Sequence, residues 1–96
     1  MLQTLINAIK DREVLKLSYS GISRGVQPHA VGVSLAGREV LLCYQIKGDH
    51  IGAGHQWNLM ELAKITHVVA TGEIFAQNAP DYKKGDERFS RIYMEV

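Results

Sequence analysis

The stretch Val14-Leu15-Lys16-Leu17-Ser18-Tyr19 decides the expected fold of this chain. Its apolar and polar residues alternate, which places Leu15, Leu17 and Tyr19 on one side of an extended segment. A period of two is typical of a β-strand with one buried face. The dipeptide Ser20-Gly21 follows with turn chemistry. The stretch therefore predicts a half-buried strand that ends in a turn.

One amphipathic helix is predicted before this strand. Four apolar residues follow the i, i+3, i+4, i+7 spacing of a helix with one apolar face: Leu2, Leu5, Ile6 and Ile9. The charged cluster at residues 10–13 ends the pattern. Because so short a helix is marginal in isolation, its apolar stripe is expected to pack against the strands.

Further extended segments follow the first strand at close spacing. They cover residues 26–34, 39–45, 57–62 and 66–70, joined by a hairpin at 35–38, an open loop at 46–56 and a tight turn at 63–65. Pro28 lacks a backbone donor, so its segment is expected to be an edge, a bend or the start of a strand. Connections this short exclude parallel crossovers. The pattern predicts a mainly β fold with one N-terminal α-helix, closed as a small β-barrel of about five antiparallel strands.

Length and composition restrict the class of protein. A chain of 96 residues forms one domain, and its net charge of +1 means that any anion site must be local. The single cysteine, Cys43, excludes an intramolecular disulfide and favours a reducing compartment. The first residues lack the pattern of a signal peptide, and the apolar runs are too short to span a bilayer. We expect a cytoplasmic protein with no membrane association.

Residues that could carry catalysis or bind a metal lack the necessary patterns. The four histidines show no metal-ligand spacing and are interpreted as surface or strand-end residues: His29, His50, His55 and His67. Cys43 lies in an apolar strand and is interpreted as a core residue. Gly52-Ala53-Gly54 lacks the context of a dinucleotide motif and is interpreted as part of a flexible loop. The sequence therefore predicts no enzyme, no metal and no cofactor.

Arg24 is the most interesting candidate for binding. It stands four residues before Pro28, and its planar guanidinium is suited to a phosphate or carboxylate. His29 follows the proline, and Tyr19 and Tyr44 belong to neighbouring strands of the expected barrel. The alternative interpretation is a solvated turn arginine beside two core tyrosines.

Several segments, taken together, resemble one known family. They are residues 5–9, 14–19, 24–31, 39–44, 57–65, 66–69 and 72–75. In order and spacing they resemble a WYL domain, with its helix, its strand ending in Tyr and its Arg-x-x-x-Pro step. The resemblance implies an Sm/SH3-like β-barrel at residues 1–75, followed by a partly ordered C-terminal extension at 76–96.

The chain departs from the family pattern at informative positions. Glu39-Val40-Leu41 stands where the family has Trp-Tyr-Leu, and Glu61 stands where it usually has arginine. An oxyanion near Glu61 would be repelled. The family residues that are retained include Arg24, Tyr44 and Lys64.

The resemblance also implies a function. WYL domains are usually effector domains of bacterial transcription regulators, and their ligands are thought to be nucleotides or single-stranded nucleic acid. This chain has no helix-turn-helix segment of its own. We therefore expect a non-catalytic ligand-sensing module in which Arg24, His29 and Lys64 hold the ligand and Tyr44 stacks on it.

A second class of function stays open. The near-neutral charge and Glu61 favour a protein-interaction or oligomerisation module with a degenerate ligand site. Its partner would be a second copy of the chain or a regulatory protein, bound at an edge strand.

Overall fold

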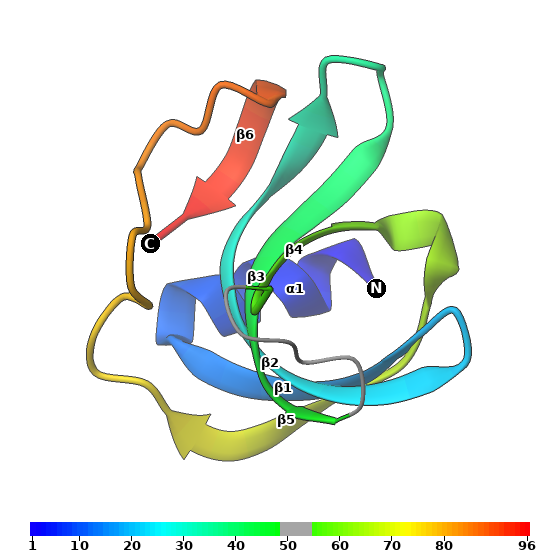
Figure 1. The fold of residues 1–96 in the computed structure, drawn as a ribbon, viewed down its shortest axis with the longest axis vertical. Helices are drawn as coiled ribbons and strands as arrows, with labels where there is room; N and C mark the ends of the chain where they lie inside the picture. The colour runs from blue at the N-terminus through cyan, green and yellow to red at the C-terminus, as the bar shows by residue number, and fades with distance from the viewer. Residues whose placement is uncertain (49–54) are drawn as a thin grey trace.

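A computed structural model describes residues 1–48 and 55–96. Over these residues the chain forms α1 (Leu2–Asp11), β1 (Glu13–Tyr19), β2 (Ile22–Ser34), β3 (Glu39–Gly48), β4 (Trp57–Glu61), the 3-10 helix η1 (Leu62–Lys64), β5 (Ile65–Ile74) and β6 (Phe89–Glu95) (Figure 1). The predicted mainly β class with one N-terminal helix is confirmed. Within the described ranges, no helix has the length and apolar character needed to cross a membrane.

The strands form one antiparallel sheet. Its order is β4-β3-β2-β1-β5, and β6 pairs with β2 outside this path. Strands β4 and β5 stand at opposite ends of the order and do not pair with each other over the described residues. The sheet is therefore not closed, and the predicted barrel is not confirmed.

Strand β2 organises the sheet because it pairs with three other strands. Along one edge it pairs with β1 over residues 22–26 and with β6 over residues 30–34; along the other edge it pairs with β3. Pro28 lies between the two halves and pairs with neither β1 nor β6, so neither ladder needs the N–H that proline lacks. The ladder with β3 shifts register between Pro28 and Ala30, which makes His29 a β-bulge. Pro28 thus belongs to a central strand, and the bulge accommodates it.

Several boundaries differ from the predicted ones. Ser20 and Gly21 have positive φ angles of 50° and 82°, which fit a tight two-residue hairpin turn, so β2 begins at Ile22 and not at residue 26. Strand β3 continues through residues 46–48, which were predicted as loop, and β5 extends to Ile74. The predicted flexible loop at Gly52-Ala53-Gly54 lies outside the described residues.

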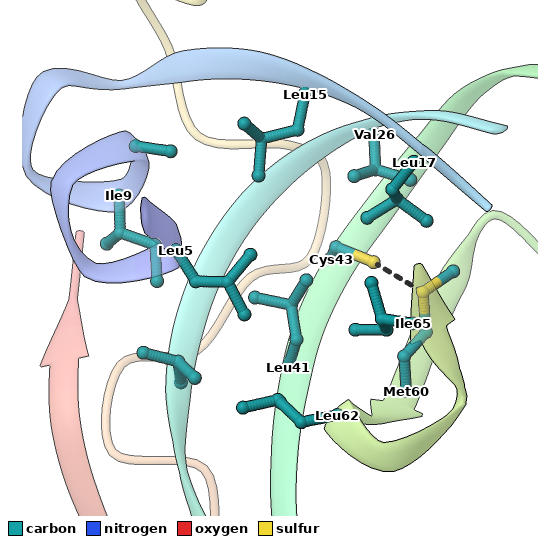
Figure 2. Packing of buried hydrophobic residues seen from close by; sticks show 12 residues of the cluster. Leu5, Ile9, Leu15, Leu17, Val26, Leu41, Cys43, Met60, Leu62 and Ile65 are labelled. Carbon is teal, nitrogen blue, oxygen red and sulfur yellow. Dashed lines mark hydrogen bonds between the residues drawn. The ribbon is translucent and has the colours of Figure 1, made fainter. Parts of the chain in front are cut away.

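The sheet carries a hydrophobic cluster on each face. On one face, Leu5 and Ile9 of α1 pack against strand residues, among them Leu15, Leu17, Leu41 and Cys43 (Figure 2). The other face carries a smaller cluster: Ala30, Val40, Leu42 and Phe89, with Trp57, Leu59, Tyr82 and Ile92 packed against it. The strap, as we name residues 75–88, runs along one side of the molecule from β5 to β6 (Figure 1).

Gly32 provides a test of how β6 is held. A Cβ at this position would clash with the carbonyl oxygen of Arg91 and come within 2.9 Å of Ile92 Cα, and both are backbone atoms. We therefore expect Gly32→Ala to lower the free energy of unfolding by about 2–3 kcal/mol, measured by urea denaturation. Gly25→Ala is the matched control, because its Cβ would meet only the side chain of Lys47, at 3.2 Å. Equal losses in the two variants would contradict this account.

Candidate functional site

The four residues predicted to bind a ligand lie in three different places. Arg24 is in the first half of β2, and Lys64 ends η1. His29 and Tyr44 both lie in a group of aromatic rings, which we name the aromatic cluster: His29, Tyr44, Trp57, Phe75 and Tyr82. The structure therefore does not assemble the predicted set into one site.

The side chain of Arg24 lies on the face of the sheet that carries the core. Its cross-strand neighbour is the buried Leu17. The guanidinium donates from Nη1 to Gln45 Oε1 at 3.2 Å and lies 5.4 Å from the centre of the Tyr19 ring. Its Nε is buried and has no hydrogen-bond partner among the described residues. The ring beside Arg24 is thus Tyr19 and not Tyr44.

Arg24 also lines a cavity of about 330 Å³, which we name the basic cavity. Its described wall consists of Val14, Lys16, Ser23, Arg24, Gly25, Lys47, Gly48, Thr71 and Glu73. Three of these residues are positively charged, although the Arg24 side chain faces the core and Lys16 and Lys47 lie on the outer face; Glu73 is the one carboxylate in the part of the wall that the structure describes. Local charge in this cavity is therefore more positive than the net charge of the chain implies.

A bulge in β3 brings two lysines together in the basic cavity. Gly25 pairs with Lys16 on one side and with Lys47 on the other. The ladder shifts between Val26–Gln45 and Gly25–Lys47, so Ile46 is the extra residue. Without this bulge, Lys47 would share the core-facing side of Gln45. Sequence reasoning missed both lysines, because only the strand register shows that they meet.

His29 is fully buried, which corrects its interpretation as a surface or strand-end residue. Nδ1 lies 2.8 Å from the carbonyl oxygen of Gln27, and Nε2 accepts a hydrogen bond from the N–H of Ala79 at 3.0 Å. Ring centres lie 4.9 Å away for Trp57, 5.2 Å for Phe75 and 5.0 Å for Tyr82. Both nitrogens are engaged and no ring surface is accessible, so His29 does not hold a ligand in this conformation.

These contacts select the neutral Nδ1–H form of the His29 ring. Nδ1 donates to the Gln27 carbonyl, and Nε2 must stay unprotonated to accept from Ala79. Burial lowers the pKa of His29; the Gln27 carbonyl raises it in part, and the positive charge of Arg12 lowers it further. His29 is therefore a structural residue that is sensitive to acid.

Tyr44 lies on the opposite face of the sheet from Arg24. Along β3, the buried Cys43 and Gln45 face the core, and Tyr44 between them points the other way. Its ring makes a T-shaped contact with Trp57, with 5.2 Å between the ring centres. Tyr44 and Arg24 thus do not contact one ligand group together.

Lys64 is partly neutralised by Glu61. Its Nζ lies 3.3 Å from Glu61 Oε2, and Arg38 Nη1 lies 2.6 Å from Oε1 of the same carboxylate. The hydrogen bond from Arg38, followed by that from Lys64, holds the pKa of Glu61 below its ordinary value. Lys64 is therefore a weaker candidate for an anion than Lys16 or Lys47.

The described residues offer little for catalysis or metal binding. No group of three His, Cys, Asp or Glu side chains among them could hold a metal ion. Cys43 is buried, as predicted, and burial raises the pKa of its thiol to about 12. The thiol is thus protonated at neutral pH and is a poor nucleophile.

The buried His29 predicts acid sensitivity. Since the pKa of His29 in the folded state is below the ordinary 6.5, the unfolded chain binds more protons than the folded chain as the pH falls. Stability should be complete above about pH 6.5 and should fall below it, with a slope of at most about 1.4 kcal/mol per pH unit. Urea denaturation between pH 7 and 5 would measure this loss.

Two variants separate His29 from other titrating groups. His29→Gln should flatten the slope between pH 6.5 and 5, whereas His67→Gln should preserve it because His67 is exposed. The carboxylates of Glu61 and Asp86 have lowered pKa values and act below this range. The same slope in wild type and His29→Gln would show that the buried ring does not cause the loss.

Comparisons with the profiles of known protein families, with curated proteins and with solved structures found no match for this chain. The resemblance to WYL domains therefore stays a prediction.

Proposed function

We propose that this chain is a non-catalytic ligand-binding module that holds a phosphate-bearing ligand in the basic cavity. The ligand would be a nucleotide or a short single-stranded nucleic acid. The observation that supports this most directly is the pair of positive side chains, Lys16 and Lys47, that flank Gly25 in the wall of one cavity. Because the whole chain carries a net charge of only +1, binding would depend on this local field.

The lysine pair would provide the main contact. Lys16 and Lys47 flank Gly25, which has no side chain to separate them. The stem of Lys47 lies over Gly25, so a phosphate group would be held further out and accept hydrogen bonds from the ammonium groups of Lys16 and Lys47. Lys64 is not part of this site because Glu61 offsets its positive charge, and His29 is not part of it because its side chain is buried.

Arg24 would act as a fixed positive charge at the edge of the cavity. Its guanidinium is already held by Gln45 and the Tyr19 ring, so little side-chain freedom would be lost on binding. The Tyr19 ring is also covered by this guanidinium on one face. Phosphate contacts would therefore dominate, with little preference among bases.

We also infer that the sheet curls toward the Sm/SH3-like barrel that the resemblance implies. The end of β1 is tied to the corner between β4 and η1. Ser20 N–H donates to the Lys64 carbonyl at 3.1 Å, and Glu61 N–H donates to the Tyr19 hydroxyl at 3.2 Å. The two ends of the strand order, β4 and β5, are joined directly by η1, and these bonds fix that corner to β1 without a ladder between β4 and β5.

Binding of a labelled single-stranded oligonucleotide, followed by fluorescence anisotropy, tests the proposal. With the two lysine contacts to phosphate, the slope of log K against log salt should be about −1.4, since each contact to a single strand contributes about −0.7. Lys16→Ala and Lys47→Ala should each weaken binding and make the slope shallower by about 0.7. Lys10→Ala, an exposed lysine on α1, is the control. Binding that is absent at low salt, or lost equally in the control, would refute the proposal.

A second candidate function, protein interaction or oligomerisation, is favoured by strand β5. Among the described strands it pairs only with β1, and Val69 and Ile74 are 57% and 59% exposed. Two register shifts and the positive φ of 54° at His67 make this edge irregular, a feature that protects edges from pairing.

Sedimentation velocity separates these two functions. If β5 mediates self-association, the wild type should sediment as a dimer or larger species, and Val69→Lys should convert it to a monomer. Ala36→Lys, at the exposed hairpin between β2 and β3, is a control that should leave the association unchanged. A monomer across the micromolar range would contradict self-association.

A further inference from the structure

A second cavity lies beside the aromatic cluster. Its volume is about 150 Å³, and its described wall consists of Leu42, Trp57, Asp81, Tyr82, Lys83, Asp86 and Arg88. We name it the aromatic slot. The rings of Trp57 and Tyr82 stack with 6.1 Å between their centres and 25° between their planes. A cavity of this volume has room for about one six-membered ring.

The walls of the aromatic slot are held in place from behind. Trp57 donates from Nε1 to the carbonyl oxygen of Pro80 at 2.8 Å, and Tyr44 contacts the indole edge-on. His29 contacts both Trp57 and Tyr82 and binds Ala79 of the strap. Since these contacts already fix the rings, a ligand would lose little affinity in ordering them.

The hydroxyl of Tyr82 is an unused polar group of this slot. It is buried and has no hydrogen-bond partner among the described residues. Burial, together with the negative charges of Glu95 and Asp86, raises the pKa of Tyr82 to about 12, so the group is a donor at neutral pH. A buried donor without a partner is unfavourable, and because this oxygen is buried a ligand in the slot would reach it only after the Tyr82 side chain shifts.

The aromatic slot continues into a larger polar hollow of about 460 Å³. This hollow is lined by Lys83, Lys84, Gly85, Asp86, Glu87 and Arg88, three of which also line the slot. Asp86 accepts bonds from Arg88 Nε at 3.0 Å, Nη2 at 2.8 Å and the backbone N–H at 2.9 Å, which offsets its charge. The two lysines then outnumber the remaining carboxylate of the hollow, Glu87, so an anionic group is favoured there.

We propose that the slot and the hollow together bind a small molecule with a planar aromatic ring and an anionic group, the chemistry of a mononucleotide. One six-membered ring would stack in the aromatic slot against Trp57 and Tyr82, with the second ring of a fused base such as adenine outside it, and the anionic group would lie near Lys83 and Lys84. This site goes beyond the proposed function. Its described walls share no residue with those of the basic cavity, so each site can be tested without the other.

The chain reports on this slot directly, because Trp57 is its only tryptophan. One indole N–H signal in a nitrogen–proton correlation spectrum, and the intrinsic fluorescence, therefore both come from the wall of the slot. AMP should shift the indole signal and quench the fluorescence in a saturable way. Adenosine should do the same with several-fold lower affinity, and inorganic phosphate should leave the indole signal in place.

Variants then assign the contacts. Tyr82→Leu should lower the affinity for AMP at least about tenfold by removing the second ring, a loss of about 1.4 kcal/mol. Lys83→Ala with Lys84→Ala should reduce the response to AMP to that of adenosine. Both lysines are exposed, so this double variant is expected to fold even if Tyr82→Leu does not. Lys16→Ala should leave the response of Trp57 unchanged.

Clear outcomes would overturn the proposal. It fails if millimolar AMP leaves both Trp57 signals unchanged, or if AMP and adenosine bind equally well. It also fails if Lys16→Ala abolishes the response, which would assign the binding to the basic cavity. Loss of oligonucleotide binding in Lys16→Ala with an intact response at Trp57 would instead support both sites.

Discussion

The buried imidazole of His29 is the constraint on which the rest of this structure depends. It joins segments that are far apart in the sequence: its nitrogens bind Gln27 and Ala79, and its backbone carbonyl accepts from Val96 N–H at 2.9 Å. Through these bonds the strap and the C-terminal end are fixed to the middle of β2. Since the strap carries Tyr82 and other walls of the aromatic slot, this one side chain contributes both to stability and to the shape of a cavity.

Charge compensation separates structural cations from candidate binding cations. Arg38 and Lys64 share the carboxylate of Glu61, and Arg88 is bound to Asp86. Lys16 and Lys47 form no ion pair with the described residues and lie across Gly25 from each other. Uncompensated charge in a concave wall attracts ligands, whereas exposed ion pairs contribute little to stability or binding. Lys16 and Lys47, which sequence spacing does not single out, are therefore the strongest candidates for binding an anion.

The helix and the strands could be predicted because their apolar residues repeat with the periods of those elements, as at Leu15 and Leu17. The burial of His29 could not, since it follows from a β-bulge that no local pattern announces. The pairing of Lys16 with Lys47 required the register of three strands. The candidate site was thus only partly predictable: Arg24 was found, but its neighbours are set by long-range pairing.

The two bulges also determine which changes of length the chain can tolerate. Side chains of a strand alternate between faces, so each extra residue reverses the alternation beyond it. Deleting Ile46 would leave Lys47 opposite Gly25 and facing outward, and deleting the residue at 29 would likewise give a regular ladder with β3, with loss of the buried imidazole. A loss of one residue at either bulge would therefore keep the faces of the sheet, whereas the loss of one residue from a regular part of β2 or β3 would invert the side chains beyond it.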